Sequence, residues 1–125
     1  MKNLYKAANI VKENAYAPYS KFKVGAAVRC SSGEVYSGCN VENASYGLTI
    51  CAERAAIFSA VAAGHTDIKE VLIVGSEEFL PPCGACRQVM QEFGVEKVHL
   101  SGRDGAIESY SLKELLPLAF TDKDI

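Results

Sequence analysis

Three cysteines of the sequence are spaced in a way that suits metal binding. Cys83 and Cys86 stand three positions apart, directly after Pro82, and Cys51 lies upstream of them. If both segments begin helices, a spacing of three puts the Cys83 and Cys86 sulfurs on one side of the first turn. Three thiolates leave one position of a tetrahedral zinc ion open, which is the arrangement of a catalytic zinc and not of a closed structural one.

Charged residues accompany these cysteines. Glu53 follows Cys51 by two positions, so on a helix its carboxylate diverges from the sulfur and can face the open position of the metal. Arg54 directly follows Glu53, and Arg87 directly follows Cys86. Hydrogen bonds from these two arginines to sulfur would offset the negative charge of three thiolates around a divalent cation. We therefore expect one zinc ion per chain, with Glu53 as the residue that moves protons.

Plainer interpretations of the cysteines and histidines remain open. Cys39 or His99 could supply a fourth ligand and close the site into a structural zinc centre. That interpretation leaves Glu53 without a role. Cys30 and Cys39 both lie in strand-like segments, and we expect them to be small buried hydrophobic residues.

The composition limits the kind of protein that carries this site. A chain of 125 residues with 49% hydrophobic and 22% charged residues has the size and core material of one domain, residues 1–125. Its net charge of −2 lacks the positive field of a general nucleic-acid binder. We find neither an apolar stretch of about 20 residues nor the apolar core of a signal peptide. We therefore expect a cytoplasmic protein without membrane or nucleic-acid partners, in a compartment that keeps cysteines reduced.

Local patterns predict the elements that position these residues. Pro82 suits the first turn of a helix that Gly94 would end, and Ser111 and Glu114 have the spacing of a capping box. A hairpin followed by alternating helices and strands predicts an α/β fold, a three-layer α-β-α sandwich with helices on both faces of a mixed sheet. The predicted helices span residues 3–14 and 51–63, with others after Pro82 and Ser111, and the predicted strands span residues 22–30, 34–41, 71–74 and 97–100.

Four blocks of the chain resemble, in order and spacing, the small homotetrameric zinc-dependent cytidine deaminases. The Cys-Ala-Glu and Pro-Cys-x-x-Cys segments are similar to the Cys₃ form of the zinc nucleobase deaminase motif. The resemblance implies a five-stranded sheet and hydrolytic deamination of cytidine and deoxycytidine to uridine and deoxyuridine, a reaction of pyrimidine salvage. The four blocks are Phe22–Ala27, Gly38–Tyr46, Cys51–Arg54 and Pro82–Gln88.

The resemblance also implies roles for individual residues. Cys51, Cys83 and Cys86 would hold zinc, and Glu53 would carry a proton from water to ring atom N3 and then one to the leaving amine. The other implied contacts are to the substrate: Phe22 stacking on the pyrimidine with Val24 beside it, Asn40 and Glu42 at the ribose 3′-hydroxyl, and the main chain of Ala52 and Pro82 at the amide edge of the base. Phe22 could equally belong to the core.

Two further aspects of the resemblance concern neighbouring subunits and a departure from the family pattern. In that family neighbours complete each active site, and Tyr46 and Phe120 are the residues that could reach across. The family commonly has Ser-Pro before the first cysteine of the Cys-x-x-Cys pair, whereas this chain has Pro81 and Pro82. The carbonyl before the cysteine survives this change, but any hydroxyl contact at position 81 is lost.

Other functions remain open. Deaminases of a modified cytosine nucleoside such as blasticidin S share the zinc motif. Polynucleotide cytidine deaminases usually have a His-x-Glu first ligand and a basic surface, whereas this chain has Cys51 and a net charge of −2. A zinc-stabilised interaction module without catalytic activity would bind the metal and act on no nucleoside.

Overall fold

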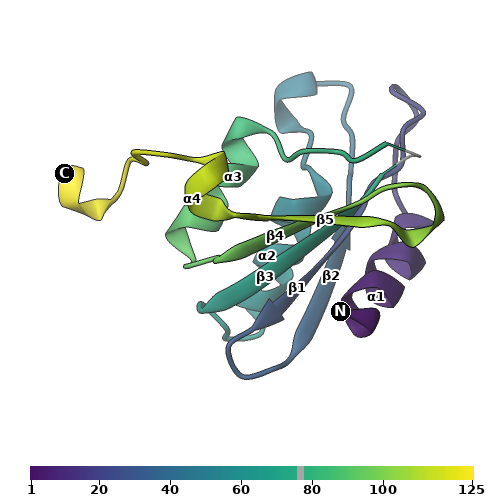
Figure 1. Cartoon of the computed structure of the whole chain (residues 1–125). Coiled ribbons are helices and arrows are strands. Elements are labelled where there is room, and N and C mark those ends of the chain that lie inside the picture. Colours follow the sequence, from purple (N-terminus) through teal and green to yellow (C-terminus); the bar gives the residue numbers. More distant parts are fainter. Residues whose placement is uncertain (76–77) are drawn as a thin grey trace.

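The structure is a computed structural model that describes residues 1–75 and 78–125, except for the side chain of Arg103. A five-stranded sheet lies between two layers of helix (Figure 1). This arrangement confirms the predicted α-β-α sandwich. The strands are β1 (Gly25–Cys30), β2 (Val35–Cys39), β3 (Ile68–Val74), β4 (Lys97–Ser101) and β5 (Ile107–Ser111). The helices are α1 (Lys2–Lys12), α2 (Ala52–Ala62), α3 (Gly84–Glu92) and α4 (Leu112–Leu115), with 3₁₀ turns at Tyr46–Leu48, Arg103–Gly105 and Asp122–Asp124.

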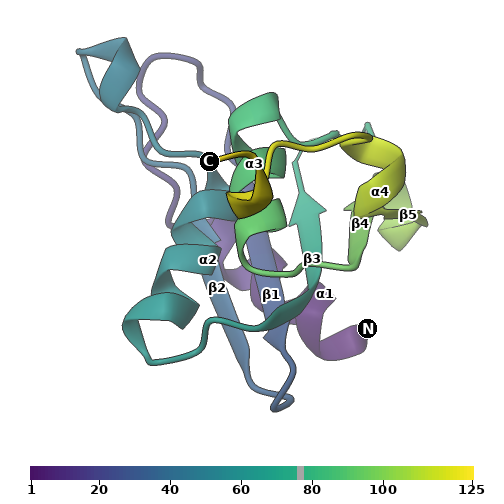
Figure 2. The ribbon, with the colours of Figure 1, turned by 90° about the vertical axis from the view of Figure 1, so that its left-hand side faces the viewer.

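The sheet is mixed, and its strand order is β2-β1-β3-β4-β5. Only the β3–β4 pair is parallel among the described pairs, and the others are antiparallel. Helix α1 covers one face, while α2 and α3 cover the other (Figure 2). The β3 side chains divide between the two layers, since Val71 and Ile73 join the core under α2 and α3, and Leu72 and Val74 join the core under α1. A strand buried on both faces explains the continuous apolar run that the sequence shows there.

Several element ends agree with the sequence prediction. Gly64 and Gly94 adopt positive φ angles of 97° and 75° directly after α2 and α3, where a left-handed residue ends a helix without a Cβ clash. Ser111 and Glu114 form the predicted capping box at the start of α4. None of the described helices is long and apolar enough to cross a membrane.

Other element ends differ from the prediction. Residues 22–24, which were predicted to begin the first strand, precede β1. The side chain of Asn40, and not a neighbouring strand, forms hydrogen bonds with the Phe22 carbonyl oxygen and the Val24 main-chain nitrogen. Pro82 lies outside the first turn of α3, since the extended Cys83 is the N-cap residue. The local patterns also left out β5, an edge strand whose side chains are exposed or only half-buried.

The absence of a side chain at Gly38 lets α2 pack directly against the sheet. A Cβ atom at Gly38 of β2 would lie 2.3 Å from the main-chain nitrogen of Ala56 and 2.6 Å from the carbonyl carbon of Ala55. Both atoms belong to the helix backbone, so they cannot rotate away as a side chain could. Gly38 therefore sets the distance between β2 and the helix that carries Cys51 and Glu53 at its start.

Replacing Gly38 by alanine tests this contact. We expect Gly38→Ala to lower the free energy of unfolding by about 3 kcal/mol, since the new methyl group has to push α2 away from the sheet. The control is Gly47→Ala, because among the described residues, its two chain neighbours apart, no heavy atom lies within 4 Å of a Cβ at Gly47; its effect should stay within about 0.5 kcal/mol. Urea unfolding of both variants measures the difference, and equal effects would contradict the assigned contact.

Candidate metal centre and active-site cavity

The three predicted cysteine ligands converge at the starts of two helices. Cys51 is the N-cap residue of α2, Cys83 is the N-cap residue of α3, and Cys86 lies in the first turn of α3. Their sulfur atoms all lie within 4.8 Å of one another, and this is the only such group of possible metal ligands among the described residues. The helix starts therefore bring together residues that are far apart in the sequence.

The sulfur positions fit a tetrahedral zinc ion. A Zn–S bond of about 2.3 Å and tetrahedral angles require sulfurs about 3.8 Å apart. The Sγ atoms of Cys51 and Cys83 are 3.9 Å apart, and those of Cys83 and Cys86 are 3.4 Å apart. Three sulfurs at this spacing can hold a zinc ion and leave one position for another ligand.

Arg54 lies against the sulfur cluster as predicted. Its Nη2 atom donates a hydrogen bond to the Cys51 sulfur at 3.3 Å. Its Nε atom is buried and has no hydrogen-bond partner among the described residues. Hydrogen bonds from Cys86 and Arg54 lower the pKa of the Cys51 thiol to about 5. The positive ends of α2 and α3 favour thiolates in the same way.

Arg87 differs from the expectation that it would donate to sulfur. Its Nε donates to the carbonyl oxygen of Pro82 at 2.9 Å, and its Nη1 donates to the carbonyl oxygen of Leu115 at 2.7 Å. The side chain reaches these two carbonyls because it leaves the first turn of α3 on the side that faces α4. Arg87 thus connects the segment before Cys83 to the C-terminal part of the chain.

Glu53 is buried next to the sulfurs. Its side chain lies in the first turn of α2, and only 4% of the residue is exposed. Burial raises the pKa of the Glu53 carboxyl to about 7. A buried carboxyl group beside a metal-binding cluster is a common feature of sites that transfer protons.

A cavity of about 250 Å³ opens over Glu53 and the sulfur cluster. It brings together five of the predicted substrate-binding residues with Glu53 and two of the three cysteines. The lining residues are Ser20, Phe22, Val24, Asn40, Glu42, Thr49, Cys51, Ala52, Glu53, Leu80, Pro81 and Cys83.

Asn40 holds the irregular segment that carries Phe22. Its Nδ2 donates to the carbonyl oxygen of Phe22 at 2.9 Å, and its Oδ1 accepts from the main-chain nitrogen of Val24 at 2.9 Å. The Asn40 main-chain nitrogen also donates to the carbonyl oxygen of Val24 at 3.2 Å, so one residue bonds this segment through both its side chain and its main chain. Asn40 therefore fixes the position of Phe22 and still has one amide N–H for a ligand.

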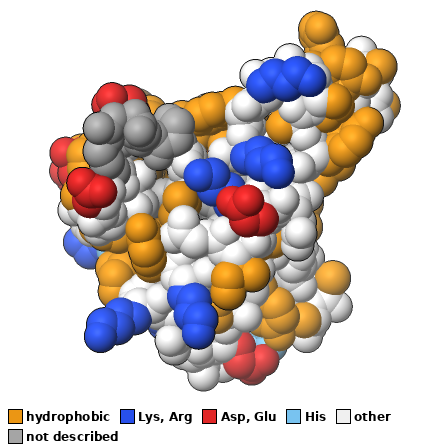
Figure 3. All heavy atoms as spheres, turned by 90° about the vertical axis from the view of Figure 1, so that its right-hand side faces the viewer, with side chains coloured by type: hydrophobic (Ala, Val, Ile, Leu, Met, Phe, Trp, Pro, Cys, Tyr) orange, Lys and Arg blue, Asp and Glu red, His pale blue; other side chains and the backbone are white. Residues whose placement is uncertain are grey.

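Tyr46 and Phe120 do not line this cavity. Tyr46 lies in a loop that projects from the body of the chain, and its ring, 76% exposed, packs edge-on against Tyr19. Figure 3 shows this projection, largely apolar, at its upper right. Phe120 lies in the C-terminal arm that leaves the body after α4 (Figure 1), and it is 59% exposed. Both residues are available to another molecule, as the resemblance implied.

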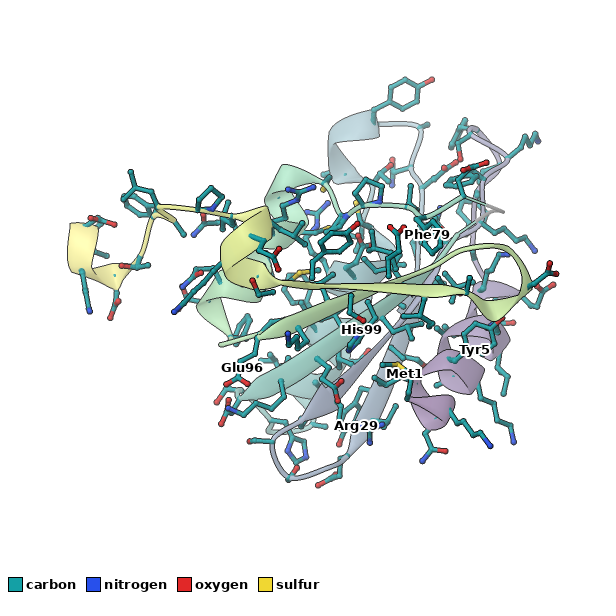
Figure 4. The ribbon with its side chains drawn as sticks, viewed as in Figure 1. Met1, Tyr5, Arg29, Phe79, Glu96 and His99 are labelled. Carbon is teal, nitrogen blue, oxygen red and sulfur yellow. The ribbon has the colours of Figure 1, made fainter. Side chains whose placement is uncertain are left out.

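The alternative fourth ligands lie apart from the sulfur cluster. His99 on β4 (Figure 4) is flanked by two residues of the core under α2 and α3, so its side chain points to the opposite face of the sheet. There its Nε2 is hydrogen bonded to Glu70 at 2.9 Å and its Nδ1 to Ser109 at 2.7 Å. Cys39 is half-buried on β2, and Cys30 is buried in the core. The described geometry therefore leaves the three-cysteine site open.

Three residues of the cavity were not anticipated from the sequence. Ser20, Thr49 and Leu80 come from irregular segments. A hydroxyl two positions before the predicted aromatic Phe22 was the one available signal, because Ser side chains commonly bond to the main chain two residues on. Thr49 and Leu80 had no such signal.

Comparisons with known proteins identify the family. A family model described as the cytidine and deoxycytidylate deaminase zinc-binding region matches residues 1–101. A cytidine deaminase of Halalkalibacterium halodurans is 48% identical over 98% of this chain and 95% of its own. The crystal structure of cytidine deaminase from Burkholderia pseudomallei superposes with a TM-score of 0.89 at 50% identity, covering 95% of this chain and 98% of that one. The corresponding structure from Mycobacterium tuberculosis has a TM-score of 0.84 at 39% identity, covering 96% of both chains. Matches of this extent in sequence and structure show that the chain belongs to the cytidine deaminase family.

Proposed function

We propose that this protein catalyses the hydrolytic deamination of cytidine and deoxycytidine to uridine and deoxyuridine, with release of ammonia. The observation that carries the proposal is the buried carboxyl group of Glu53 beside a three-cysteine cluster, in a cavity that also contains Phe22, Asn40 and Glu42. An acid–base group, a metal-binding cluster and polar groups for a sugar are the parts that this reaction needs.

Cys51, Cys83 and Cys86 would hold one zinc ion per chain, and Arg54 would stabilise their thiolate form. A zinc ion in this position supplies Lewis acidity that lowers the pKa of water from about 15.7 to about 7. Cys30 and Cys39 lie outside the cluster and have no part in the proposed site.

Glu53 would move the protons of the reaction. Its carboxylate takes a proton from the attacking water and delivers it to ring atom N3, while the water oxygen adds to C4 of the cytosine. Glu53 then takes the proton of the new C4 hydroxyl group and delivers it to the exocyclic amine, the C4–N bond breaks as the C4 carbonyl forms, and ammonia leaves. The burial of Glu53 supports this role, because bulk water cannot easily exchange with the transferred proton.

The remaining residues of the cavity would bind and orient the nucleoside. Phe22 would stack on the pyrimidine with Val24 in the wall beside it, and Asn40 and Glu42 would receive the 3′-hydroxyl of the sugar. The main chain of Ala52 and the carbonyl oxygen of Pro82 would read the amide edge of the base. Arg87 would orient that carbonyl, since it already donates to it.

We further propose that residues 1–125 act as one domain of a cytoplasmic homotetramer in pyrimidine salvage, and that Tyr46 and Phe120 contact neighbouring copies. Three observations support the assembly: the exposed apolar loop at Tyr46, the exposed C-terminal arm, and the absence of both residues from the cavity of their own chain. A reducing compartment is needed to keep the three metal-binding cysteines as free thiols.

Substitution of Glu53 tests the chemistry. We expect Glu53→Gln to lower kcat on cytidine about a thousandfold, because the amide keeps the shape but cannot accept a proton. Zinc content should be unchanged, since Glu53 is not one of the three ligands. The loss of cytosine absorbance measures turnover. The matched control is Glu13→Gln, at an exposed glutamate after α1. Substantial activity of Glu53→Gln would exclude the acid–base role, and a wild-type protein that acts on blasticidin S but not on cytidine would favour the alternative substrate.

Metal analysis tests the ligand set. We expect one zinc per chain in the purified protein, and less than about a tenth of that in Cys83→Ala, because two sulfurs bind zinc far more weakly than three. Cys39→Ser is the matched control and should keep its zinc. Elemental analysis after dialysis gives the stoichiometry. Loss of zinc from Cys39→Ser would contradict the open site and support a closed structural centre.

The C-terminal arm provides a test of assembly. Leu118 and Phe120 are both exposed on the arm, and Gln88 donates to the carbonyl oxygen of Phe120 at 2.9 Å. We expect the double substitution Leu118→Ser and Phe120→Ser to shift the protein from tetramer to smaller species, because it removes apolar surface that only a neighbour can bury. Ile10→Ser, at an exposed apolar residue of α1, should leave the assembly unchanged. Light scattering after size exclusion distinguishes these outcomes, and an unaltered tetramer would contradict the role of the arm.

A further inference from the structure

Ser20 forms a hydrogen-bonded link between two residues of the cavity. Its hydroxyl donates a hydrogen bond to Oε2 of Glu42, and it accepts one from the main-chain nitrogen of Phe22 at 3.0 Å. One hydroxyl therefore contacts both the side chain that would receive the sugar and the main chain of the residue that would stack on the base.

The other oxygen of Glu42 is held by the same segment. Oε1 accepts from the main-chain nitrogens of Tyr19 and Ser20, at 2.9 Å and 3.1 Å. The carboxylate can accept about four hydrogen bonds, and these contacts use three of them. One acceptor position remains for a ligand. The hydrogen bond from Ser20 also lowers the pKa of the Glu42 carboxyl, which keeps it an acceptor at neutral pH.

The main chain between Ser20 and Phe22 passes through a residue in an unfavourable conformation, and the Ser20 hydroxyl bridges it. Lys21 adopts a positive φ angle of 61°, a left-handed conformation that costs free energy for a residue with a side chain. Ser20 spans this position by accepting from Phe22, two residues on. The turn brings Phe22 into the cavity, where Asn40 holds its carbonyl oxygen from the other side.

The position of Ser20 in the cavity also points to the ligand. Ser20, Glu42 and Thr49 line both the cavity over Glu53 and an adjoining hollow of about 280 Å³ that includes Tyr19 and Tyr46. The three residues therefore form the boundary at which the two spaces meet. A nucleoside whose base lies over Glu53 would place its sugar at this boundary.

We propose that Ser20 is a positioning residue for the sugar of the substrate: its hydroxyl orients the Glu42 carboxylate toward the 3′-hydroxyl. This inference rests on the proposed function, since it assumes that Glu42 receives the 3′-hydroxyl of a cytosine nucleoside.

The test pairs a substitution with a truncated substrate. We expect Ser20→Ala to raise KM for cytidine about tenfold with kcat changed by less than about twofold, because a loosened carboxylate weakens ground-state and transition-state binding alike. On 2′,3′-dideoxycytidine, which lacks the 3′-hydroxyl, the same substitution should change kcat/KM by about twofold or less. Ser20→Thr keeps a hydroxyl and should restore most of the affinity for cytidine.

The controls separate positioning from stability. Ser32→Ala is the matched variant, because the Ser32 hydroxyl also contacts a glutamate, Glu34, on the exposed turn of the β1–β2 hairpin. It should leave KM unchanged on both substrates. Thermal unfolding of each variant shows whether the fold is intact. If Ser20→Ala is unstable, the KM values of Ser20→Thr on the two substrates provide a second test.

Failure of this inference differs from failure of the proposed function. If Ser20→Ala lowers kcat/KM equally on cytidine and on 2′,3′-dideoxycytidine, Ser20 only stabilises the turn and the positioning role is overturned. The same holds if Ser20→Thr is as impaired as Ser20→Ala. A wild-type protein that deaminates neither cytidine nor deoxycytidine would instead overturn the function itself.

Discussion

The repulsion among three closely placed sulfurs is the constraint on which the rest of the structure depends. Thiolates within 4.8 Å of one another repel strongly in a partly buried site unless positive charge compensates them. The positive ends of α2 and α3 and the guanidinium of Arg54 provide that charge. Two helices can supply it only if both begin at one place, so the sheet has to carry them on the same face. Gly38 permits this, because it lets α2 lie directly on β2.

The cavity beside the sulfurs keeps its shape through side-chain hydrogen bonds to the main chain, whereas the helix starts position the sulfur cluster. Its walls come mainly from segments outside the helices and strands, whose main-chain groups have no regular partners. Asn40, Glu42 and Arg87 supply the missing partners by bonding to the main chain at the edges of the cavity. The same polar side chains thus maintain the shape of the cavity and present atoms to a ligand. A substitution among them changes both properties together, so it needs a truncated substrate or a matched variant to be interpreted.

The metal ligands and their neighbours could be predicted from the sequence because they depend on short-range geometry. A spacing of three brings the sulfurs of Cys83 and Cys86 together on any helix, and the same spacing of three places Arg54 near Cys51. Arg87 directly follows a cysteine, but its side chain leaves the helix toward Pro82 and Leu115. Which of two nearby acceptors a long side chain reaches depends on the packing of α4, and no local pattern contains that information. The edge strand β5 was missed for a similar reason, since an exposed strand shows little apolar periodicity.

The exposed aromatic residues lie apart from the residues that would carry the chemistry. Tyr46 and Phe120 stand on segments that project from the body, where the proposed neighbouring copies would cover them. The sulfur cluster and Glu53, in contrast, are positioned within one chain by α2 and α3. This division separates two kinds of effect. Changes at the helix starts should act on the chemistry of each site singly, whereas in the proposed homotetramer changes on the projecting segments should act through the neighbouring copies. The boundary between the two lies at Ser20 and Glu42, which line both the cavity and the adjoining hollow that opens toward Tyr46.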